Sequence, residues 1–277
     1  MAEVNPSQQP TVPAAQAIHH ELRNAENSAA FVLPTLQSMK MSNPYLALLD
    51  VGAGSGTISA SFAKALPDGH ITAVDLNPNI LPRARAVAEA AGVTNIDFQQ
   101  ADVKKLPFAD ASFDITFCHQ TLTHMSAPED ALREMLRVTK PGGIVAAREG
   151  DFETEAVWPD LPGLVKFHRF AAELMRSAGG TPTAGRQLLS WALEAGAERS
   201  KVAVSFGTWS YHTQSDKDTW ARGLIAVVKG GPMREKGLNA GLTTEGDLDE
   251  MIHDWEKWAA SSDSSVAMLH GEILIQR

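Results

Sequence analysis

The glycine-rich segment Gly52-Ala53-Gly54-Ser55-Gly56 constrains the fold of this chain more than any other feature. It follows an apolar stretch at 47–51 and precedes a helical pattern that begins at Thr57, which is typical of a strand–turn–helix unit in an open α/β sheet. Glycine has no Cβ and tolerates positive φ, so the main chain at this turn can approach a ligand closely. The sequence therefore predicts a nucleotide-like ligand at the carboxyl end of this strand.

The spacing of the glycines and the nearby acids indicates which nucleotide binds. A dinucleotide site has the pattern Gly-x-Gly-x-x-Gly, whereas this loop is one residue shorter. Asp50 precedes the loop, and Asp75 ends the next apolar segment, where a ribose diol would be held. S-adenosylmethionine carries a sulfonium and an ammonium group and no phosphate, so acids around the loop favour it over a dinucleotide.

Polar residues also follow the next two predicted strands. Asp102 and Val103 come after the segment 96–101, and His119 and Gln120 come after 113–118. Ligand sites in open α/β sheets lie at the carboxyl ends of strands. We therefore expect the Asp102 side chain to hydrogen-bond the adenine amino group and the Val103 main chain to bind the adenine ring nitrogen.

Alternating strand and helix patterns predict an α/β fold with a parallel sheet. Beyond residue 150 two late strands joined by a helical insertion indicate an antiparallel hairpin at the sheet edge. The predicted strands are 46–51, 71–75, 96–100, 113–118, 143–148, 201–211 and 266–276, and the predicted helices are 57–66, 79–91, 128–138, 161–178, 185–196, 216–229 and 244–260. We divide the chain into a disordered tail (1–16), an N-terminal cap helix broken at Pro34 (17–45), a cofactor-binding core (46–150) and the remaining strands with a helical substrate cap (151–277).

The composition indicates which classes of partner the chain is suited to bind. The chain has 24 basic and 33 acidic residues and a net charge of −9, which argues against a nucleic-acid substrate because phosphate-binding surfaces are basic. The single cysteine, Cys118, lies in an apolar strand, excludes an internal disulfide and fits a reducing compartment. No leader and no long apolar run appears, so we expect a cytoplasmic protein that does not bind membranes. The pair His19-His20 lacks further ligands, so no metal site is expected.

The order of these motifs resembles a known family. Leu49-Asp50-Val51 with the glycine loop, Val74-Asp75, Ala101-Asp102-Val103, Leu106-Pro107-Phe108, Ser112-Phe113-Asp114 and the segment from Leu132 to Gly143 are similar to class I S-adenosylmethionine-dependent methyltransferases of the ubiquinone-biosynthesis (UbiE-like) type. The resemblance implies a Rossmann-like sheet of seven strands. Further segments, Trp158-Pro159 and Gly185-Arg186-Gln187-Leu188 among them, resemble fungal enzymes that methylate thiols of reduced epidithiodioxopiperazines such as gliotoxin.

The resemblance implies methyl transfer from S-adenosylmethionine to a small molecule. Arg23 and Asn27 lie on one face of the predicted entry helix and are expected near the carboxylate of the cofactor. The expected cofactor-binding residues are Arg23, Asn27, Asp50, Gly52, Ala53, Gly54, Asp75, Leu76, Asp102, Val103 and His119.

Candidates for acceptor chemistry lie at the same edge. A methyl transfer requires mainly proximity and exclusion of water, so a general base is optional. We predict catalytic roles for Asp151, His119 and His124, and substrate contacts for Trp158, Arg186 and Trp209. Arg186 opens a predicted helix, where the helix dipole disfavours a cation, so it requires either a structural carboxylate or an acidic substrate group.

Several alternatives remain open at this stage. The acceptor atom and the oligomeric state are undetermined, and C- or O-methylation of a quinone, polyketide or sterol-like metabolite competes with thiol methylation. A nicotinamide-dependent oxidoreductase is disfavoured by the short glycine loop and the lack of a Tyr-x-x-x-Lys pair. A ligand sensor without catalytic activity would keep the same fold.

Overall fold

Five parallel strands form the part of the sheet that carries the predicted ligand edge. The computed structural model describes residues 20–277, so the predicted tail 1–16 lies outside the described residues. The parallel strands are β1 (Ala47–Val51), β2 (His70–Asp75), β3 (Ile96–Gln100), β4 (Phe113–His119) and β5 (Thr139–Gly150), in the spatial order β3-β2-β1-β4-β5. Their carboxyl ends meet at one edge, as the alternation predicted, because each crossover returns the chain in the same direction.

The other side of the sheet is antiparallel. β8 (Ser265–Gln276) lies beside β5 and also pairs with β7 (Val202–Tyr211) and β6 (Ala156–Trp158), all antiparallel. The predicted fold class, a Rossmann-like and mostly parallel sheet with a reversed edge, is confirmed. β6 adds an eighth strand of three residues, which is too short to give a sequence pattern.

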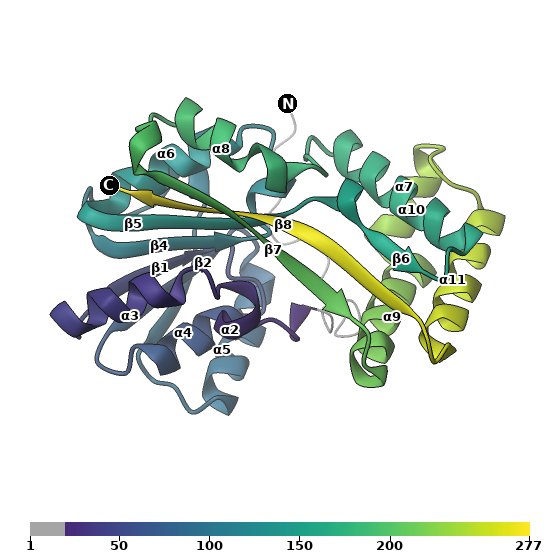
Figure 1. Cartoon of the computed structure of the whole chain (residues 1–277), viewed down its shortest axis with the longest axis horizontal. Coiled ribbons are helices and arrows are strands. Elements are labelled where there is room, and N and C mark those ends of the chain that lie inside the picture. Colours follow the sequence, from purple (N-terminus) through teal and green to yellow (C-terminus); the bar gives the residue numbers. More distant parts are fainter. Residues whose placement is uncertain (1–19) are drawn as a thin grey trace.

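Helices cover both faces of the sheet (Figure 1). α2 (Ala25–Ser28), α3 (Leu33–Ser42), α4 (Thr57–Ala65) and α5 (Leu81–Ala90) cover one face, and α6 (Pro128–Val138) and α8 (Ala184–Glu194) cover the other. Phe62 and Phe117 form the core under the first layer, and Leu132 and Trp191 form part of the core under the second. Such two-sided packing explains why β1 and β4 are buried at almost every position.

The N-terminal segment differs from the predicted cap helix, which was expected to be broken at Pro34. A one-turn helix, α2, is capped reciprocally by Asn24 and Asn27, and α3 starts separately at Leu33. Pro34 occupies the first turn of α3, where its missing N–H costs nothing. The proline therefore begins a helix and does not break one.

The cap is a separate helical layer inserted between β7 and β8 (Figure 1). It contains α9 (Gln214–Lys229), α10 (Pro232–Asn239) and α11 (Glu245–Ala260), packed with α7 (Pro162–Ser177) around the fully buried Trp255 and Trp258. These tryptophans therefore form the cap core. α10 was not predicted, since it has only eight residues and Gly237 weakens its helical pattern. Among residues 20–277, no helix has the length and apolarity of a membrane span.

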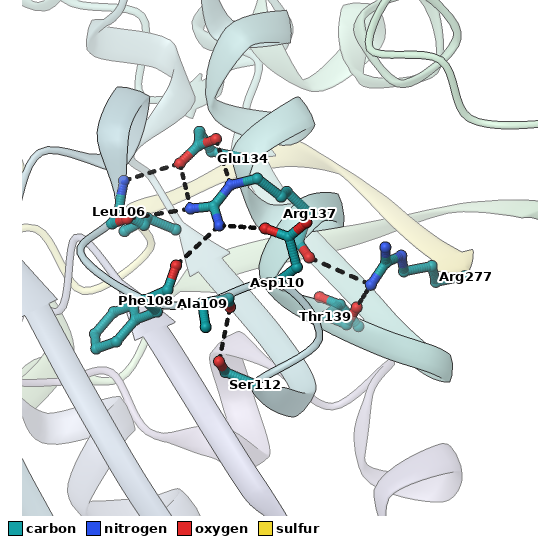
Figure 2. Close-up of polar contacts among 9 residues, drawn as sticks. All are labelled: Leu106, Phe108, Ala109, Asp110, Ser112, Glu134, Arg137, Thr139 and Arg277. Atoms are coloured by element: carbon teal, nitrogen blue, oxygen red, sulfur yellow. Dashed lines mark hydrogen bonds and ion pairs between the residues drawn. The ribbon is translucent and has the colours of Figure 1, made fainter.

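A polar network fixes the connection between β3 and β4. Arg137 of α6 donates to Glu134 and Asp110 and to the carbonyl oxygens of Leu106 and Phe108, at 2.8–3.1 Å (Figure 2). Glu134 accepts in turn from the Leu106 N–H at 2.9 Å. The 106–112 connection is thereby attached to α6, which fixes the segment that follows Asp102.

Candidate active site at the carboxyl edge of the sheet

Two adjoining cavities lie at the carboxyl ends of β1, β2 and β4. The glycine cavity, of about 270 Å³, is bordered by Arg23, Asp50, Gly54 and His119 among others. The adenine-side cavity, of about 380 Å³, is bordered by Leu76, Asp102, Val103 and His124 among others. Gly52, Asp75 and Gln120 line both cavities. Apart from Asn27, the structure brings the residues predicted to bind the cofactor to this edge.

The glycine loop presents main-chain atoms to the glycine cavity. Gly52 and Gly54 have φ of +73° and +54°, and the N–H groups of Gly52 and Ala53 both donate to the Val74 carbonyl at 2.8 and 3.0 Å. A Cβ at Gly54 would meet no atom of residues 20–277 within 4 Å, whereas one at Gly52 would collide with the Thr121 side chain. The space at Gly54 is therefore open for a ligand, and Gly52 is required by the neighbouring turn.

Asp75 connects the two cavities. Its carboxylate accepts the N–H of Gly54 at 2.9 Å and the N–H of Asn77 at 2.9 Å. A carboxylate has about four acceptor positions, so these two bonds leave capacity for the hydroxyls of a ligand. Asp75 thus fixes the loop and offers a polar group where a ribose was predicted.

Asp50 lies deeper than Asp75. It is almost fully buried, and the Ser59 hydroxyl donates to it at 2.5 Å. Burial raises the pKa of Asp50 to about 7, although the Ser59 hydrogen bond opposes this rise. The charge at the floor of the glycine cavity therefore changes near neutral pH.

The adenine-side cavity has an apolar mouth and polar ends. Leu76 is exposed there, and Asp102 caps the short 3-10 helix Val103–Lys105 by accepting the Lys104 N–H at 2.9 Å. His124 also lines this cavity, from the 3-10 helix Leu122–His124 that follows β4. This arrangement suits a flat ring with polar edges.

Gln120 is a candidate ligand-binding residue that the sequence analysis did not assign. It has a φ of +54°, which is uncommon for a residue other than glycine and is frequent at functional sites. Within residues 20–277, its side-chain Nε2 is buried without a hydrogen-bond partner. A buried, unpaired amide is costly, so Gln120 is a group that a bound ligand would satisfy. Its place directly after β4 was the only signal in the sequence.

A cluster of basic and aromatic side chains, the Arg23–Trp209 cluster, borders the glycine cavity. The Arg23 guanidinium lies 4.6 Å from the ring centroid of Trp209. The rings of His119 and His270 lie 5.7 and 4.1 Å from the same indole. These four residues define the cluster. His270 was not predicted, because the register of β7 with β8 brings it beside Gly207 and hence near Trp209.

Burial determines the charges in this cluster. It lowers the pKa of Arg23 to about 10, that of His270 to about 3 and that of His119 well below its usual range, with the nearby arginines lowering both histidines further. At neutral pH Arg23 is therefore charged and both imidazoles are neutral. His119 Nε2 and His270 Nε2 are buried and have no partner within the described residues.

Five predicted site residues line neither cavity, namely Asn27, Asp151, Trp158, Arg186 and Trp209. Asn27 caps α2 and donates to the Leu22 carbonyl at 2.7 Å. Asp151 is buried and its carboxylate is paired with the guanidinium of Arg186 at the start of α8. Trp158 is 58% exposed on β6 and donates to Asp263 at 3.3 Å. The Asp151 N–H donates to the Leu269 carbonyl of β8. The chain therefore turns away from the ligand edge directly after β5.

The Asp151–Arg186 pair shows which kind of partner Arg186 has. Arg186 was expected to need either a structural carboxylate or an acidic substrate group, and the structure supplies the carboxylate of Asp151, with Nη2 to Oδ1 at 2.7 Å. Because neither residue lines either cavity, the catalytic role predicted for Asp151 and the substrate contact predicted for Arg186 stay predictions. Within residues 20–277, no group of three or more potential metal ligands occurs.

Comparison with known proteins identifies the family. The profile of the family described as "Methyltransferase domain" matches residues 49–147. A probable methyltransferase of Aspergillus luteorubrus, ltbC, is 32% identical over 269 residues, which is 92% of this chain and 91% of the relative. The chain belongs to the S-adenosylmethionine-dependent methyltransferases. A ubiquinone/menaquinone biosynthesis C-methyltransferase UbiE of Pseudomonas fluorescens is 39% identical over 112 residues, covering 40% of this chain and 44% of the relative.

Solved structures agree on the fold of the methyltransferase. The YcgJ protein of Bacillus subtilis superimposes with a TM-score of 0.54 at 19% identity, covering 90% of this chain and 99% of that one. The [4+2]-cyclase SpnF superimposes with a TM-score of 0.51 at 23% identity, covering 98% and 84%. At these identities the likeness shows the fold alone.

The cavities suit S-adenosylmethionine, the methyl donor of this family. The open space at Gly54 admits a ligand against the main chain, and the unpaired amide of Gln120 needs a polar partner. Asp75, Asp102 and the Val103 main chain are the groups that would hold the cofactor.

Proposed function

We propose that this methyltransferase transfers a methyl group to an acidic group, first of all a thiol, of an apolar small molecule. The observation that supports this proposal is the Arg23–Trp209 cluster beside the glycine cavity. It contains a charged guanidinium stacked on an indole and two imidazoles whose pKa values are lowered by burial. This surface suits an anion on an apolar ring system.

The chemistry of methyl transfer explains why the charge matters. Bound S-adenosylmethionine supplies a methyl group on a positively charged sulfur, so the acceptor must present a free lone pair. A thiol with a pKa of about 8.5 forms its anion readily when a nearby cation lowers that value. Arg23 would do this, and the same cation would disfavour a protonated amine in the site.

The histidines are poorly suited to act as strong bases. Desolvation and the charges of Arg23 and Arg148 keep the pKa of His119 well below its usual range, so a proton taken from the acceptor would not stay on its ring. His119 Nε2 would instead hydrogen-bond the acceptor, since this atom is buried and has no partner among the described residues. The acidity of the acceptor then has to supply the anion, which favours a thiol over an alcohol.

The resemblance to fungal enzymes of epidithiodioxopiperazine metabolism names a matching acceptor class. A reduced dithiol on an apolar bicyclic ring would place its sulfur near Arg23 and its ring against Trp209. A second candidate is C- or O-methylation of a phenol or enol, because the UbiE relative is named a C-methyltransferase and such acceptors also react as anions.

A direct assay separates these candidates. The protein is incubated with methyl-labelled S-adenosylmethionine and matched aromatic acceptors that carry a thiol, a phenol or an amine, and the products are identified by mass spectrometry. We expect the thiol to be methylated fastest, with a rate that rises with pH up to the pKa of the bound thiol. Preferential methylation of the amine, or a rate on the thiol that does not depend on pH, would contradict the proposal.

A further inference from the structure

A single buried carboxylate holds the turn that follows β4. Glu149, near the end of β5, is fully buried. Its Oε1 accepts the N–H groups of Thr121 and Leu122 at 3.0 and 2.9 Å, and its Oε2 accepts the N–H of Thr123 at 3.1 Å. Three successive main-chain donors therefore converge on one side chain. Such charge-assisted hydrogen bonds are stronger than neutral ones.

This turn positions two groups at the cofactor cavities. The Thr121 hydroxyl donates to the Val51 carbonyl at 3.2 Å and occupies the space that a Cβ at Gly52 would need. Gln120 precedes the turn, has a positive φ and lines both cavities. Gly150, the residue after Glu149, leaves room for Gln120, since a Cβ there would lie 2.8 Å from Gln120 Nε2. Glu149 and Gly150 together thus determine where the unpaired amide lies.

We propose that Glu149 is a positioning residue for cofactor binding: it fixes the 121–123 turn, and through that turn it holds Thr121 and the Gln120 amide against the glycine loop. Glu149 itself lines neither cavity and does not act on the methyl group. The inference rests on the assignment of the cofactor cavities and not on the identity of the acceptor, so it can be tested without an acceptor.

A carboxylate is required because all three partners are donors. A glutamine at position 149 has one acceptor atom, and its NH₂ group would face at least one main-chain N–H. A protonated Glu149 has the same defect, because one oxygen becomes a donor. The two forms should therefore disturb the turn in the same way.

The buried surroundings of Glu149 raise its pKa, so its carboxylate gains a proton near neutral pH. Burial raises its pKa to about 7, against the opposing effects of the three N–H donors and of Arg23. The other titratable group that interacts with it is the Cys118 thiol of β4, whose pKa burial raises well above its usual value. As the pH falls below about 7, Glu149 gains a proton and the turn loses an acceptor. Cofactor affinity should therefore fall as the solution becomes more acidic.

The test uses S-adenosylhomocysteine binding, measured by calorimetry from pH 6 to pH 8. At pH 8 we expect Glu149→Gln to bind about 10- to 100-fold more weakly than the wild type. The wild type should lose about tenfold in affinity between pH 8 and pH 6, whereas Glu149→Gln should change little. Asp254→Asn is the matched control, since Asp254 is also buried and accepts a main-chain N–H, from Gly163 at 2.7 Å, but lies in the cap. It should bind like the wild type.

A second variant has to exclude Asp50 as the cause of the pH dependence, because the pKa of Asp50 is also about 7 and its side chain lines the glycine cavity. In an Asp50→Asn background the loss of affinity at low pH should persist if Glu149 causes it. This arm also decides the matter if Glu149→Gln does not fold. Hydrogen exchange adds a local measure: amide exchange in Glu149→Gln should increase at 120–124 and remain unchanged in β1 and β2.

Two results would overturn the proposal. One is wild-type affinity in Glu149→Gln at pH 8, and the other is an affinity in the Asp50→Asn protein that does not change with pH. If Glu149→Gln behaves as expected and thiol acceptors still fail to react, the proposed acceptor is wrong and the positioning role stands.

Discussion

The two halves of the ligand edge are built in different ways. The proposed cofactor half uses mainly residues 50–127, in which strand ends, glycines and main-chain hydrogen bonds form the cavities. The proposed acceptor half, the Arg23–Trp209 cluster, uses side chains from the N-terminal segment, β4, β7 and β8 that meet only in the folded chain. The proposed donor site is therefore built mainly of main-chain groups at strand ends, whereas selection of the acceptor would depend on side chains from distant parts of the chain.

The sharpest test of this contrast is a side chain placed in the cofactor half. Gly54→Val should reduce S-adenosylhomocysteine affinity more than about 100-fold, because the Cβ enters ligand space. The left-handed backbone adds a loss of stability of about 1–2 kcal/mol. Gly142→Val is the control: it has a φ of +83° and an equally open Cβ position away from the cavities. Equal binding losses in the two variants, measured calorimetrically, would attribute the effect to backbone strain alone.

Removing a carboxylate from the same half should have the next largest effect. Asp75→Ala removes the acceptor of the Gly54 and Asn77 N–H groups and the predicted ribose contact. We expect cofactor binding to weaken by about 1.5–3 kcal/mol, with the fold retained. Asp97→Ala, an exposed site on the neighbouring β3, should leave the dissociation constant unchanged. A wild-type value for Asp75→Ala would remove this residue from the site.

A substitution of Arg23 tests whether this residue serves the cofactor or the acceptor, since it borders the glycine cavity and packs on Trp209. Arg23→Met should lower kcat/KM for a thiol acceptor by about tenfold and shift the pH–rate midpoint upward, because the acceptor anion loses its cation. Cofactor affinity should change less. If cofactor affinity falls as much as kcat/KM, Arg23 belongs to the cofactor half, as the sequence analysis assigned it. Arg222→Met, an exposed substitution in α9, is the control.

The smallest effect on turnover is expected for a residue that belongs to neither half. Asp151→Asn weakens the pair with Arg186 and should lower the free energy of unfolding by about 1 kcal/mol, measured by urea denaturation. Turnover at saturating acceptor should remain within about twofold of the wild type. A large loss of turnover in a stably folded variant would instead support the catalytic role that its place after β5 suggested.

The same contrast explains what the sequence could predict. The sheet and its reversed edge follow from local patterns of alternation, and Asp75 and Gly54 follow from a turn whose geometry is dictated by a few adjacent residues. The N-terminal helix was wrong in extent because its apolar spacing continues across Ala29–Val32, where the Asn24–Asn27 cap and Pro34 define two separate helices.

The acceptor half was largely beyond sequence reasoning. Trp209 was assigned to the substrate site and lies in the Arg23–Trp209 cluster, but His270 and the neutral state of His119 follow from strand register and burial. Asp151 was assigned from its place after β5; the sequence indicated that Arg186 needs a carboxylate partner, but not that Asp151 is that partner. The role proposed for Glu149 rests on three main-chain contacts that no residue pattern encodes.

The position of β8 also affects how the chain is made. β8 separates β5 from β7 and also pairs with β6, yet ribosomes synthesise it after every other strand described here. Until it emerges, the edge of β5 and both edges of β7 have no strand partner, and the cap has no second attachment to the sheet. A nascent chain would therefore leave the edge of β5 without its antiparallel partner from about residue 150 until β8 is made at 265–276, and unpaired strand edges of this kind favour association with other chains.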